Sequence, residues 1–549
     1  MNKNTKNSLF LMMGLLVLNF INQSFYKRLD LTQDKRYTLS KTTNKILSKV
    51  NKRLFITVYL EGDFPPEFKR LQVETRQYLE ELAAKNSLIK IHFENPDKQR
   101  EDLIKKGMMP SQLTVEEDGK LSEAIIFPWA EINFGNQTKI ISLLPNAMVA
   151  SQEEQLQTAI ENLEYSFSTV INSITQKEQK KIAFLTGNGQ LDDIYLISFL
   201  TKVSQKYRLA KFTLDAVAKN PQKTLDNLNQ YDLAIIAKPT QKFTSEEKFT
   251  LDQFIANGGK TLWMIDNVQA DQDSLLNSGK MMAYPRDLNL TDLLFSYGIR
   301  INTTLIKDLY AAKIALATGT VGQQTQFQNL DWLYHPLAGG NPNNAITKNI
   351  APVRLQFANQ IDTLKNNIRK TPLLMSSPLT QKVGTPTVIE LQSIADEPLE
   401  KEYVSGNQLF AVLLEGDFNS AYKNRVKPFE TSLFKENATN NKMIVIADGD
   451  IAKNQILKGK PTDLSRDKWT NEEFGNKDFL LNTVDYLLDD TGLMELRNKT
   501  LKINLLDKQK AFKERTFWQF LNVVLPLVLL FAFGAVFNYL RKKKYSSQN

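Results

Sequence analysis

YDLAIIAKPTQKFTSEEKFTLDQFIANGGKTLWMID, residues 231–266, decides the fold because it predicts a strand, a helix and a second strand in succession. The runs AIIA and LWM are continuously apolar, which is typical of parallel strands that are buried on both faces. Thr244 or Ser245, followed by Glu247, forms a capping box that begins the helix, and the glycine pair 258–259 ends it. Strands that alternate with helices in this way predict a parallel, doubly wound α/β sheet.

The same alternation continues on both sides of this stretch. Upstream, KIAFLTGNG at 181–189 predicts a buried strand that ends in a glycine turn, followed by a helix (191–207) and the strand RLAKFTL (208–214). Downstream, MIVIADGD at 443–450 predicts another apolar strand, which we expect in the same sheet, and KDFLLNTVDYLL at 477–488 predicts a closing helix. The expected fold class is therefore α/β.

A long segment interrupts this pattern. Between about Thr303 and Pro428, short apolar runs alternate with glycine, proline and asparagine, and the helical period is lost. We interpret residues 303–440 as a β-rich insertion or subdomain. It would divide the α/β domain into a first part, 177–302, and a second part with a linker, 441–515.

Residues 26–150 predict a separate α/β domain with elements in the order β-α-β-α-β-β. Its last three strands are expected at 111–116, 123–132 and 137–143. This order resembles the thioredoxin-like fold. Glu61-Gly62-Asp63-Phe64 stands where that family carries its redox cysteine pair, so the resemblance implies the scaffold without the activity.

Residues 151–176 predict one connecting helix. Its apolar residues are spaced alternately by four and three positions, which forms a heptad stripe on one helix face. The stripe consists of Leu156, Ile160, Leu163, Phe167, Val170 and Ile174. Fewer than three full heptads are present, which favours a helix that packs on its own domains over an intermolecular coiled coil.

Two hydrophobic segments predict membrane-spanning helices at 8–25 and 516–540. A cleavable signal peptide is the alternative for the first segment, but no A-x-A-like cleavage site follows it. The remaining tails, 1–7 and 541–549, would lie on one side of the membrane. The RKKK cluster at 541–544 favours the cytoplasm for that side, so we expect an inner-membrane protein with most of its chain in the periplasm.

The second span also offers candidate contacts with membrane lipid and with a membrane partner. Trp518 lies at its edge, where tryptophan is enriched in spanning helices. Pro526 and Gly534 allow a bend and a close approach between helices. We therefore predict that Trp518, Pro526 and Gly534 face a partner subunit.

The composition excludes several classes of function. The absence of cysteine excludes disulfides, thiolate metal sites and cysteine nucleophiles, and the two histidines cannot build a multi-histidine metal site within one chain. The net charge of +9 comes from dispersed lysines, so we expect no nucleic-acid binding. No GxxxxGK[ST] phosphate loop and no Gly-x-Ser-x-Gly nucleophile motif occurs. We therefore predict no catalytic residue, no metal and no cofactor.

A ligand crevice is expected at the carboxyl ends of the strands, because loops and helix N-termini converge there in a doubly wound sheet. The candidate residues at this edge are Gly187, Asn188, Gly189, Thr240, Asp266, Asp448 and Asp450. Turns require the same residue types for backbone reasons alone, so a structural turn is the favoured interpretation. His335, in DWLYHPLAGGNP, either binds a sugar or peptide or, as we favour, packs in a loop under Trp332 and Tyr334.

Four stretches in order carry a family resemblance. They are LDQFIANGGKTLWMID (251–266), DLNLTDLLFSYGIRI (287–301), MIVIADGDIAKNQ (443–455) and FGNKDFLLNTVDYLLDDTGL (474–493). With the anchors, they resemble the GldG family, the gliding-motility-associated ABC-transporter auxiliary proteins of Bacteroidetes. The resemblance spans nearly the whole chain. It implies a non-enzymatic partner of an ABC permease and a cytoplasmic ATPase, and a middle domain similar to the amidotransferase-like domain of intraflagellar-transport proteins.

The expected function is therefore a non-catalytic, membrane-anchored component of an ABC transporter complex that is required for gliding motility. Its extracytoplasmic α/β domains would bind a substrate, or an envelope or secretion-system protein. The alternative is an extracytoplasmic solute receptor that holds a glycan or peptide in the crevice at the strand ends. A hydrolase of envelope polymers is a third class, and it needs paired carboxylates that the sequence alone cannot place together.

Overall fold

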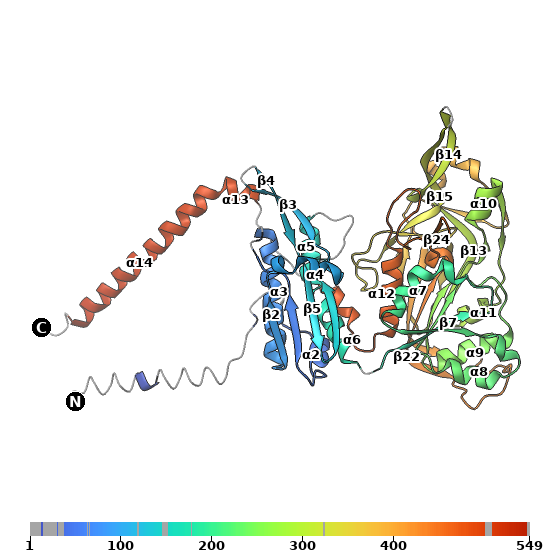
Figure 1. The fold of residues 1–549 in the computed structure, drawn as a ribbon, viewed down its shortest axis with the longest axis horizontal. Coiled ribbons are helices and arrows are strands. Elements are labelled where there is room, and N and C mark those ends of the chain that lie inside the picture. The colour runs from blue at the N-terminus through green and yellow to red at the C-terminus, as the bar shows by residue number, and fades with distance from the viewer. Residues whose placement is uncertain are drawn as a thin grey trace. The chain divides into compact units, whose positions relative to one another are not determined.

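The computed structural model describes residues 12–14, 30, 38–62, 64, 66–117, 120–144, 152–176, 178–321, 324–499 and 508–545. The chain divides into two units, residues 1–499 and residues 500–549. The strands of the first unit form one large mixed sheet and several small sheets (Figure 1).

The large sheet has ten strands, of which five are parallel neighbours in the order β8-β7-β9-β10-β22. This is the strand order of flavodoxin-like doubly wound sheets. The five strands are Arg208–Thr213 (β8), Lys181–Thr186 (β7), Leu233–Ala237 (β9), Lys260–Met264 (β10) and Asn437–Ile446 (β22). The expectation that the strand near 443–450 joins this sheet is confirmed, because β22 pairs with β10.

Antiparallel strands continue the sheet beyond β22 in the order β21-β18-β15-β14, so the expectation of a parallel sheet holds for only part of it. Strands that follow one another through hairpins, such as β14 and β15, pair antiparallel. The segment expected as a β-rich insertion supplies these strands, which makes it continuous with the α/β sheet. They are Leu409–Asn419 (β21), Arg369–Met375 (β18), Gln324–Gly340 (β15) and Ala311–Val321 (β14), with Val353–Arg354 (β16) paired to β15.

Smaller sheets complete this part of the chain. One contains Val268–Gln269 (β11), Lys280–Pro285 (β12) and Thr387–Glu390 (β20). Another contains Asn359–Thr363 (β17), Ile299–Asp308 (β13) and Thr380–Gly384 (β19), and a hairpin joins Ile456–Leu457 (β23) to Lys460–Pro461 (β24).

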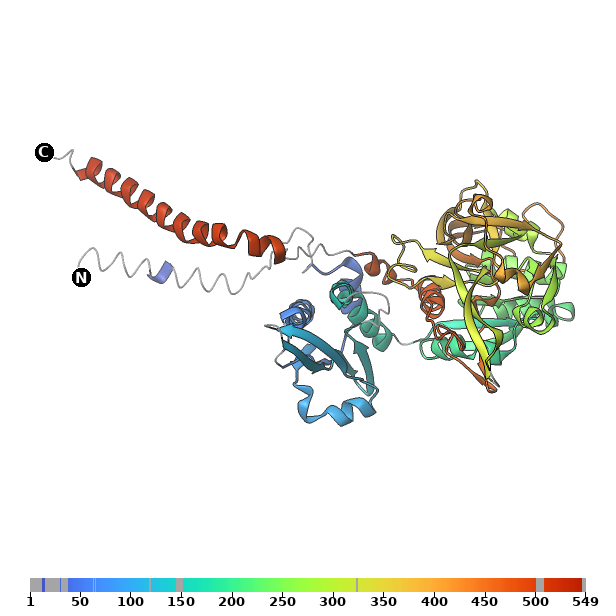
Figure 2. The same ribbon diagram turned by 90° about the horizontal axis from the view of Figure 1, so that it is seen from above.

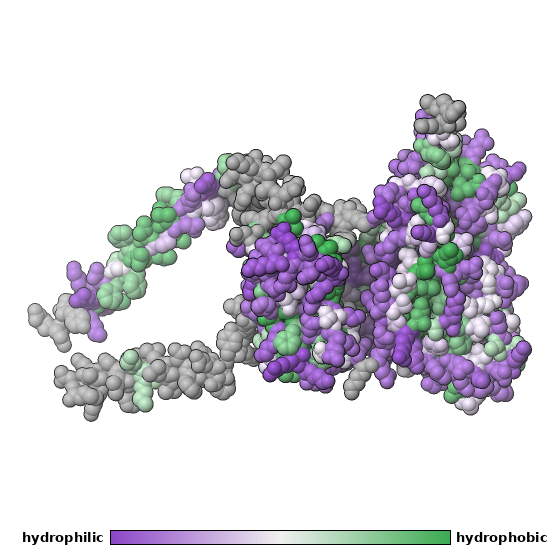
Figure 3. Space-filling view, in the orientation of Figure 1, coloured by the Kyte–Doolittle hydropathy of each residue, from purple (hydrophilic) through white to green (hydrophobic). Residues whose placement is uncertain are grey.

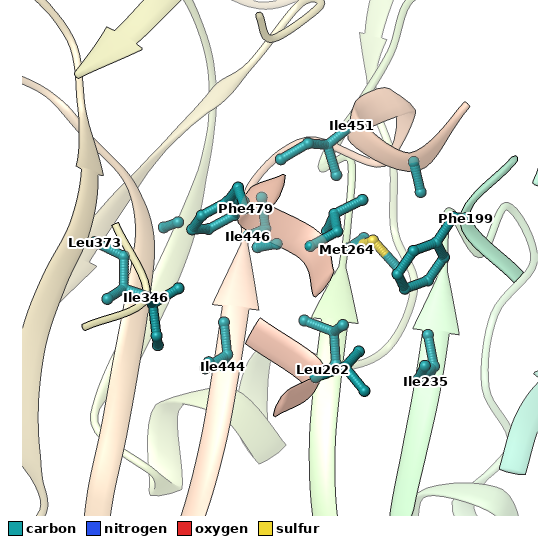
Figure 4. Packing of buried hydrophobic residues seen from close by; sticks show 14 of the residues in the cluster. Phe199, Ile235, Leu262, Met264, Ile346, Leu373, Ile444, Ile446, Ile451 and Phe479 are labelled. Atoms are coloured by element: carbon teal, nitrogen blue, oxygen red, sulfur yellow. The ribbon is translucent and has the colours of Figure 1, made fainter. Parts of the chain in front are cut away.

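Helices cover both faces of the parallel strands. Ile182 and Ala183 are adjacent on β7 and belong to two different apolar cores, because successive strand residues point to opposite faces. On the Ile182 side, Phe199 and Phe479 pack against Leu262 and its neighbours (Figure 4). The helices around the sheet are Ile197–Ser204 (α7), Pro221–Leu228 (α8), Ser245–Ala256 (α9), Gln272–Ser278 (α10), Thr291–Ser296 (α11) and Asn476–Leu488 (α12).

Helix α9 begins with the predicted capping box. The Thr244 hydroxyl accepts a hydrogen bond from the Glu247 amide at 3.2 Å, and the Glu247 carboxylate accepts one from the Thr244 amide at 2.9 Å. Every residue from Glu247 to Ala256 is buried. The outer side is covered by rings from a later segment, since Phe249 lies against Tyr422 and Phe434. The helix is therefore a central element of the core.

The N-terminal region contains a four-stranded sheet in the order β2-β1-β5-β6, with β1 parallel to β2 and antiparallel to β5 (Figures 1 and 2). The expectation of one strand at 123–132 is wrong, because Phe127 and Pro128 separate two strands there. The first belongs to a separate hairpin and the second to this sheet. The strands are Leu54–Val58 (β1), Ile89–Phe93 (β2), Trp129–Phe134 (β5) and Gln137–Ser142 (β6), and the hairpin joins Ser111–Glu117 (β3) to Lys120–Ile126 (β4). The helices are Lys41–Leu47 (α2), Pro66–Lys85 (α3) and Arg100–Lys105 (α4).

The connector consists of two helices, Gln152–Glu161 (α5) and Leu163–Thr175 (α6), and not of one. It packs on its own region, where α5 contacts α3 and α6 contacts α2, β5 and β6. Ile171 is buried and Val170 is only half-buried. The buried face of α6 therefore follows the period of an ordinary α-helix and not the strict spacing of a heptad repeat. This packing is what the favoured interpretation of the stripe predicts.

The second unit contains Lys508–Lys513 (α13) and the long helix Arg515–Tyr545 (α14). Among the described residues, Arg515–Lys544 is the one helix that is long and apolar enough to cross a membrane, with a mean hydropathy of 2.5 in its most apolar window. Its large apolar side chains are exposed, as the hydrophobic band along α14 in Figure 3 shows. The first predicted span, 8–25, lies outside the described residues apart from Met12–Gly14.

Candidate functional site

Three buried carboxylates meet at the carboxyl edge of the parallel strands. Asp266 follows β10, and Asp448 and Asp450 follow β22. One oxygen from each carboxylate lies within 4.8 Å of the other two, and all three side chains are buried. Like charges at this separation repel strongly in a low-dielectric interior, so the group requires a compensating charge.

Lys238 supplies this charge from the end of β9. Its ammonium nitrogen bonds to Asp450 and lies 3.7 Å from an oxygen of Asp266. Burial lowers the pKa of this lysine, but the carboxylates of Asp450 and Asp266 more than reverse that effect and hold the pKa above its ordinary value. The guanidinium of Arg286 lies 4.0 Å from Asp266. The Lys238 ammonium is therefore a fixed counter-ion for this group of three carboxylates.

Backbone amides hold the carboxylates in place. The Gly449 amide donates to Asp266 Oδ1 at 2.5 Å, and the Gln356 amide donates to Asp448 Oδ2 at 2.7 Å. Burial, together with the carboxylates of Asp266 and Asp450, raises the pKa of Asp448 well above its ordinary value. A Cβ at Gly449 would lie 2.8 Å from an Asp266 oxygen, so glycine is required at this close approach. These contacts tie the end of β22 to β10 and to the segment before β17.

The other predicted residues form a second hydrogen-bonded group, between the loops after β7 and β9. The Asn188 side-chain amide donates to Glu247 at 2.9 Å, and the Asn188 backbone carbonyl accepts from the Thr240 backbone amide at 2.9 Å. The Thr240 hydroxyl donates to the Gly189 carbonyl at 2.8 Å. Gly187 and Gly189 have positive φ angles, which turns favour in glycine. Hydrogen bonds between the two loops thus use these polar groups in one part of the expected crevice, beside the strand-order switch.

A cavity of about 450 Å³ lies next to the carboxylate group. Gln356 and Lys453 line it and connect it to that group, because the Gln356 amide bonds to Asp448 and the Lys453 ammonium lies 4.0 Å from Asp450. Other lining residues come from α10, β14, β15 and residues 467–469. The cavity volume is within the range of about 300–1,000 Å³ that ligand pockets commonly have.

His335 lines this cavity from strand β15, so the expectation that it lies in a loop is wrong. Tyr334 packs in an apolar cluster with Trp332. The next residue points to the other face of the strand, which brings the imidazole to the cavity. The residue is 3% exposed, and neither ring nitrogen has a hydrogen-bond partner among the residues that the structure describes. It therefore has a buried donor and a buried acceptor that the described part of the chain does not use.

The charged side chains of the cavity form two ion pairs and include Lys468, whose ammonium donates to the Ile456 carbonyl at 3.0 Å. Arg354 and Asp467 are buried and form an ion pair of 2.7 Å. Lys453 lies 3.2 Å from Asp273. The cavity therefore presents uncharged groups, two balanced ion pairs and one lysine to whatever fills it.

We expect His335 to make the protein less stable in acid. Burial and the nearby Arg354 guanidinium lower the pKa of His335 to about 3, against a small opposing effect of Asp467. Between that value and the ordinary 6.5, the unfolded chain binds a proton that the folded chain excludes, so the free energy of unfolding falls as the pH falls. Between pH 7.5 and pH 5, the loss is about 2 kcal/mol.

Urea unfolding of wild type and His335→Gln at both pH values checks this expectation. Between these pH values, the free energy of unfolding of His335→Gln should fall by about 2 kcal/mol less than that of the wild type. His92→Gln, which changes an exposed ring on β2, is the matched control and should follow the wild type. Equal losses in wild type and His335→Gln would show that the ring is accessible to protons in the folded state.

Two features of the site were not singled out from sequence. Lys238 follows the buried run AIIA directly, and a lysine at the end of a fully buried strand was the available signal for it. The cavity had no such signal, because Ile314, Arg354 and Asp467 are far apart in the chain and meet only through the antiparallel strands and the segment after β22.

Comparison with known proteins identifies the family of this chain. Residues 179–483 match the family described as an ABC-type uncharacterized transport system. This range is more than half of the 549 residues. The chain belongs to this family of ABC transport auxiliary proteins. The matched range begins before β7 and includes most of α12, so it contains both the carboxylate group and the cavity.

Membership makes the chain an auxiliary component of an ABC-type transport system. Proteins of this family are usually non-catalytic and associate with ABC transporter components. Residues 33–133 match a second family, described as a domain of unknown function. A Borreliella burgdorferi protein described as uncharacterized is 21% identical over 99% of both chains. The mmIFT52 N-terminal domain aligns with 59% of this chain and 100% of its own at 14% identity, with a TM-score of 0.31.

Proposed function

We propose that this protein is a non-catalytic component of the GldG type, which couples an ABC permease and its ATPase to an envelope partner or substrate in a gliding-motility complex. Its membership of the ABC auxiliary family carries this proposal. The four stretches quoted above support the assignment to the motility branch. The exposed apolar surface of α14 supports a role within the membrane, where Trp518, Pro526 and Gly534 are the proposed permease contacts.

The proposal includes a domain arrangement. Residues 26–150 would be a thioredoxin-like domain without redox activity, and the strand order β2-β1-β5-β6 supports it. Residues 177–302 and 441–515 would form the amidotransferase-like α/β domain, with 303–440 inserted. Two anchors, 8–25 and 516–540, would place these domains in the periplasm, and the basic run Arg541–Lys544 supports a cytoplasmic end.

Co-purification tests the coupling role. The full-length protein is isolated from its native membrane in mild detergent, and its partners are identified by mass spectrometry. An ABC permease and an ATPase are expected in constant proportion. Exchange of α14 for an unrelated spanning helix of the same length should remove both partners, whereas Trp469→Ala, a change outside the membrane helices, should retain them. An unchanged permease yield after the helix exchange would contradict the proposed contacts.

The proposed topology predicts a strong effect of charge in the middle of α14. Leu529→Arg/Leu530→Arg should raise the free energy of membrane insertion by about 6 kcal/mol, because each buried arginine costs about 2.5–3.5 kcal/mol there. The chain has no cysteine, so Lys543→Cys introduces a single thiol that a membrane-impermeant maleimide can label. In intact cells the label should stay unreacted in the Leu529→Ile/Leu530→Ile control and react in the arginine variant. Labelling of both would contradict a cytoplasmic end.

A solute receptor is the second candidate function, and the 450 Å³ cavity favours it. The crevice first expected around Asn188, Thr240, Asp266 and Asp448 is bridged at Asn188 and Thr240 by hydrogen bonds between two loops. A receptor site would therefore lie on the other side of the carboxylate group, where the buried polar atoms are unpaired.

A further inference from the structure

We propose that the cavity lined by His335, Gln272 and Trp469 is a binding site for a neutral saccharide. This inference deepens the receptor function proposed above and rests on it. The carboxylate group behind the cavity is not part of the proposed site, because its charges are compensated by Lys238.

Unused hydrogen-bonding capacity points to a ligand in this cavity. Both ring nitrogens of the buried His335 and the buried amide oxygen of Gln272 lack partners, and both residues line the cavity. Leaving such buried groups unpaired is unfavourable, so a ligand that pairs with them gains affinity. One donor and two acceptors are therefore available, and a sugar hydroxyl can both donate to an acceptor and accept from a donor.

The charge balance favours a neutral ligand. Arg354 forms an ion pair with Asp467 at 2.7 Å, and Lys453 lies 3.2 Å from Asp273. The third lining cation, Lys468, donates to the Ile456 carbonyl at 3.0 Å and lies 5.4 Å from the Trp469 ring. An anionic ligand would have to compete for these cations, and an ammonium group would have to compete for the carboxylates. The low pKa of His335 keeps its imidazole uncharged at neutral pH, which agrees with an uncharged partner.

Trp469 adds an apolar platform. Its side chain lines the cavity and is 62% exposed, so a large aromatic surface is available at the side of the cavity that solvent reaches. Apolar side chains of Leu276, Ile314 and Ile456 also line the cavity. Polar groups that fix orientation, combined with apolar and aromatic walls, are the usual composition of small-molecule sites. A sugar ring matches it, with hydroxyls at its edge and C–H groups on its faces.

A peptide is the less favoured ligand. Its terminal carboxylate would need a free cation, whereas Arg354 and Lys453 have carboxylate partners and the Lys468 ammonium already donates to the Ile456 carbonyl. Its backbone would also call for an unpaired strand edge, whereas residues 336–338 of β15 pair with β14 and β16, and the Tyr334 carbonyl accepts from the Phe357 amide at 2.9 Å. The peptide therefore serves as a comparison probe in the test.

Ligand titration of the full-length protein in lipid nanodiscs tests the proposal. Nanodiscs are required because maltoside detergents carry a disaccharide head group. The probes are maltose, cellobiose and chitobiose, with glucose 6-phosphate and trialanine for comparison, and binding is measured by saturation-transfer NMR and calorimetry at millimolar concentration. At least one neutral disaccharide should bind, and it should bind more tightly than the phosphate and the peptide. Absence of disaccharide binding, or tighter binding of either comparison probe, overturns the proposal.

Variants locate the binding. Trp469→Ala and His335→Gln should each weaken disaccharide binding at least about tenfold, which corresponds to about 1.4 kcal/mol. Trp469 is exposed, so its variant should fold normally and keep the result interpretable. Phe327→Ala, a 66% exposed ring elsewhere on β15, should bind as the wild type does. Unchanged binding in both cavity variants overturns the assignment of the site. Co-purification of the permease is a separate readout, so failure of the coupling role and failure of the saccharide site remain distinguishable.

Discussion

Lys238→Met should destabilise the full-length protein by about 3–5 kcal/mol at pH 7. The variant keeps the length and the apolar stem of the side chain but removes the ammonium group between Asp450 and Asp266. Three buried carboxylates would then face one another without their central counter-ion, and removal of one partner from a buried ion group has effects of this size. The free energy of unfolding by urea, followed through tryptophan fluorescence, measures the change.

Lys242→Met is the matched control. It removes the same charge four residues away, but both Lys242 and its partner Asp287 have 66% exposed side chains, and exposed pairs contribute at most about 1 kcal/mol. The double variant Lys238→Met/Asp450→Asn should recover part of the lost stability, because it also removes one of the repelling charges. A loss below about 1 kcal/mol in Lys238→Met would show that the carboxylates share a proton, or that water compensates them.

The parallel half of the sheet was predictable because its signals are local. In residues 231–266 the apolar runs, the capping box and the glycine pair all lie within one continuous stretch, and they correspond to β9, α9 and β10. The edge at which Asp266, Asp448 and Asp450 meet also follows from strand direction alone. Local sequence is sufficient to predict an element when capping and turn residues mark where that element begins and ends.

The antiparallel half and the cavity depend on pairings between distant segments. β18 pairs with β21, which begins more than thirty residues later, and no residue in either strand specifies that partner. His335 illustrates the consequence. Its proline and glycine neighbours predict a loop, whereas pairing of β15 with β14, β16 and β18 holds the segment as a strand and turns the imidazole to the cavity. Tertiary context overrides the local preference here.

Phe479→Ala should destabilise the protein by about 3–5 kcal/mol, the usual range for the removal of a fully buried phenylalanine ring. Phe479 is 0% exposed and lies on α12, in the apolar core with Ile446 of β22 and Ile346 (Figure 4). The ring therefore secures the closing helix against the strand that carries Asp448 and Asp450 to the site. Its removal leaves a cavity that the surrounding sheet cannot fill without moving that strand.

Phe327→Ala makes the same chemical change at a ring that is 66% exposed, and should cost less than about 0.5 kcal/mol.

The comparison also separates stability from function. If α12 only completes the core, Phe479→Ala should lower the urea midpoint while the protein that remains folded binds saccharide and transporter subunits as the wild type does. If the ring also holds β22 in register with β10, ligand affinity should fall in the folded fraction as well, because the Lys453 and Gln356 contacts beside the cavity depend on the end of β22. A stability loss equal to that of Phe327→Ala would contradict the placement of α12 on the sheet.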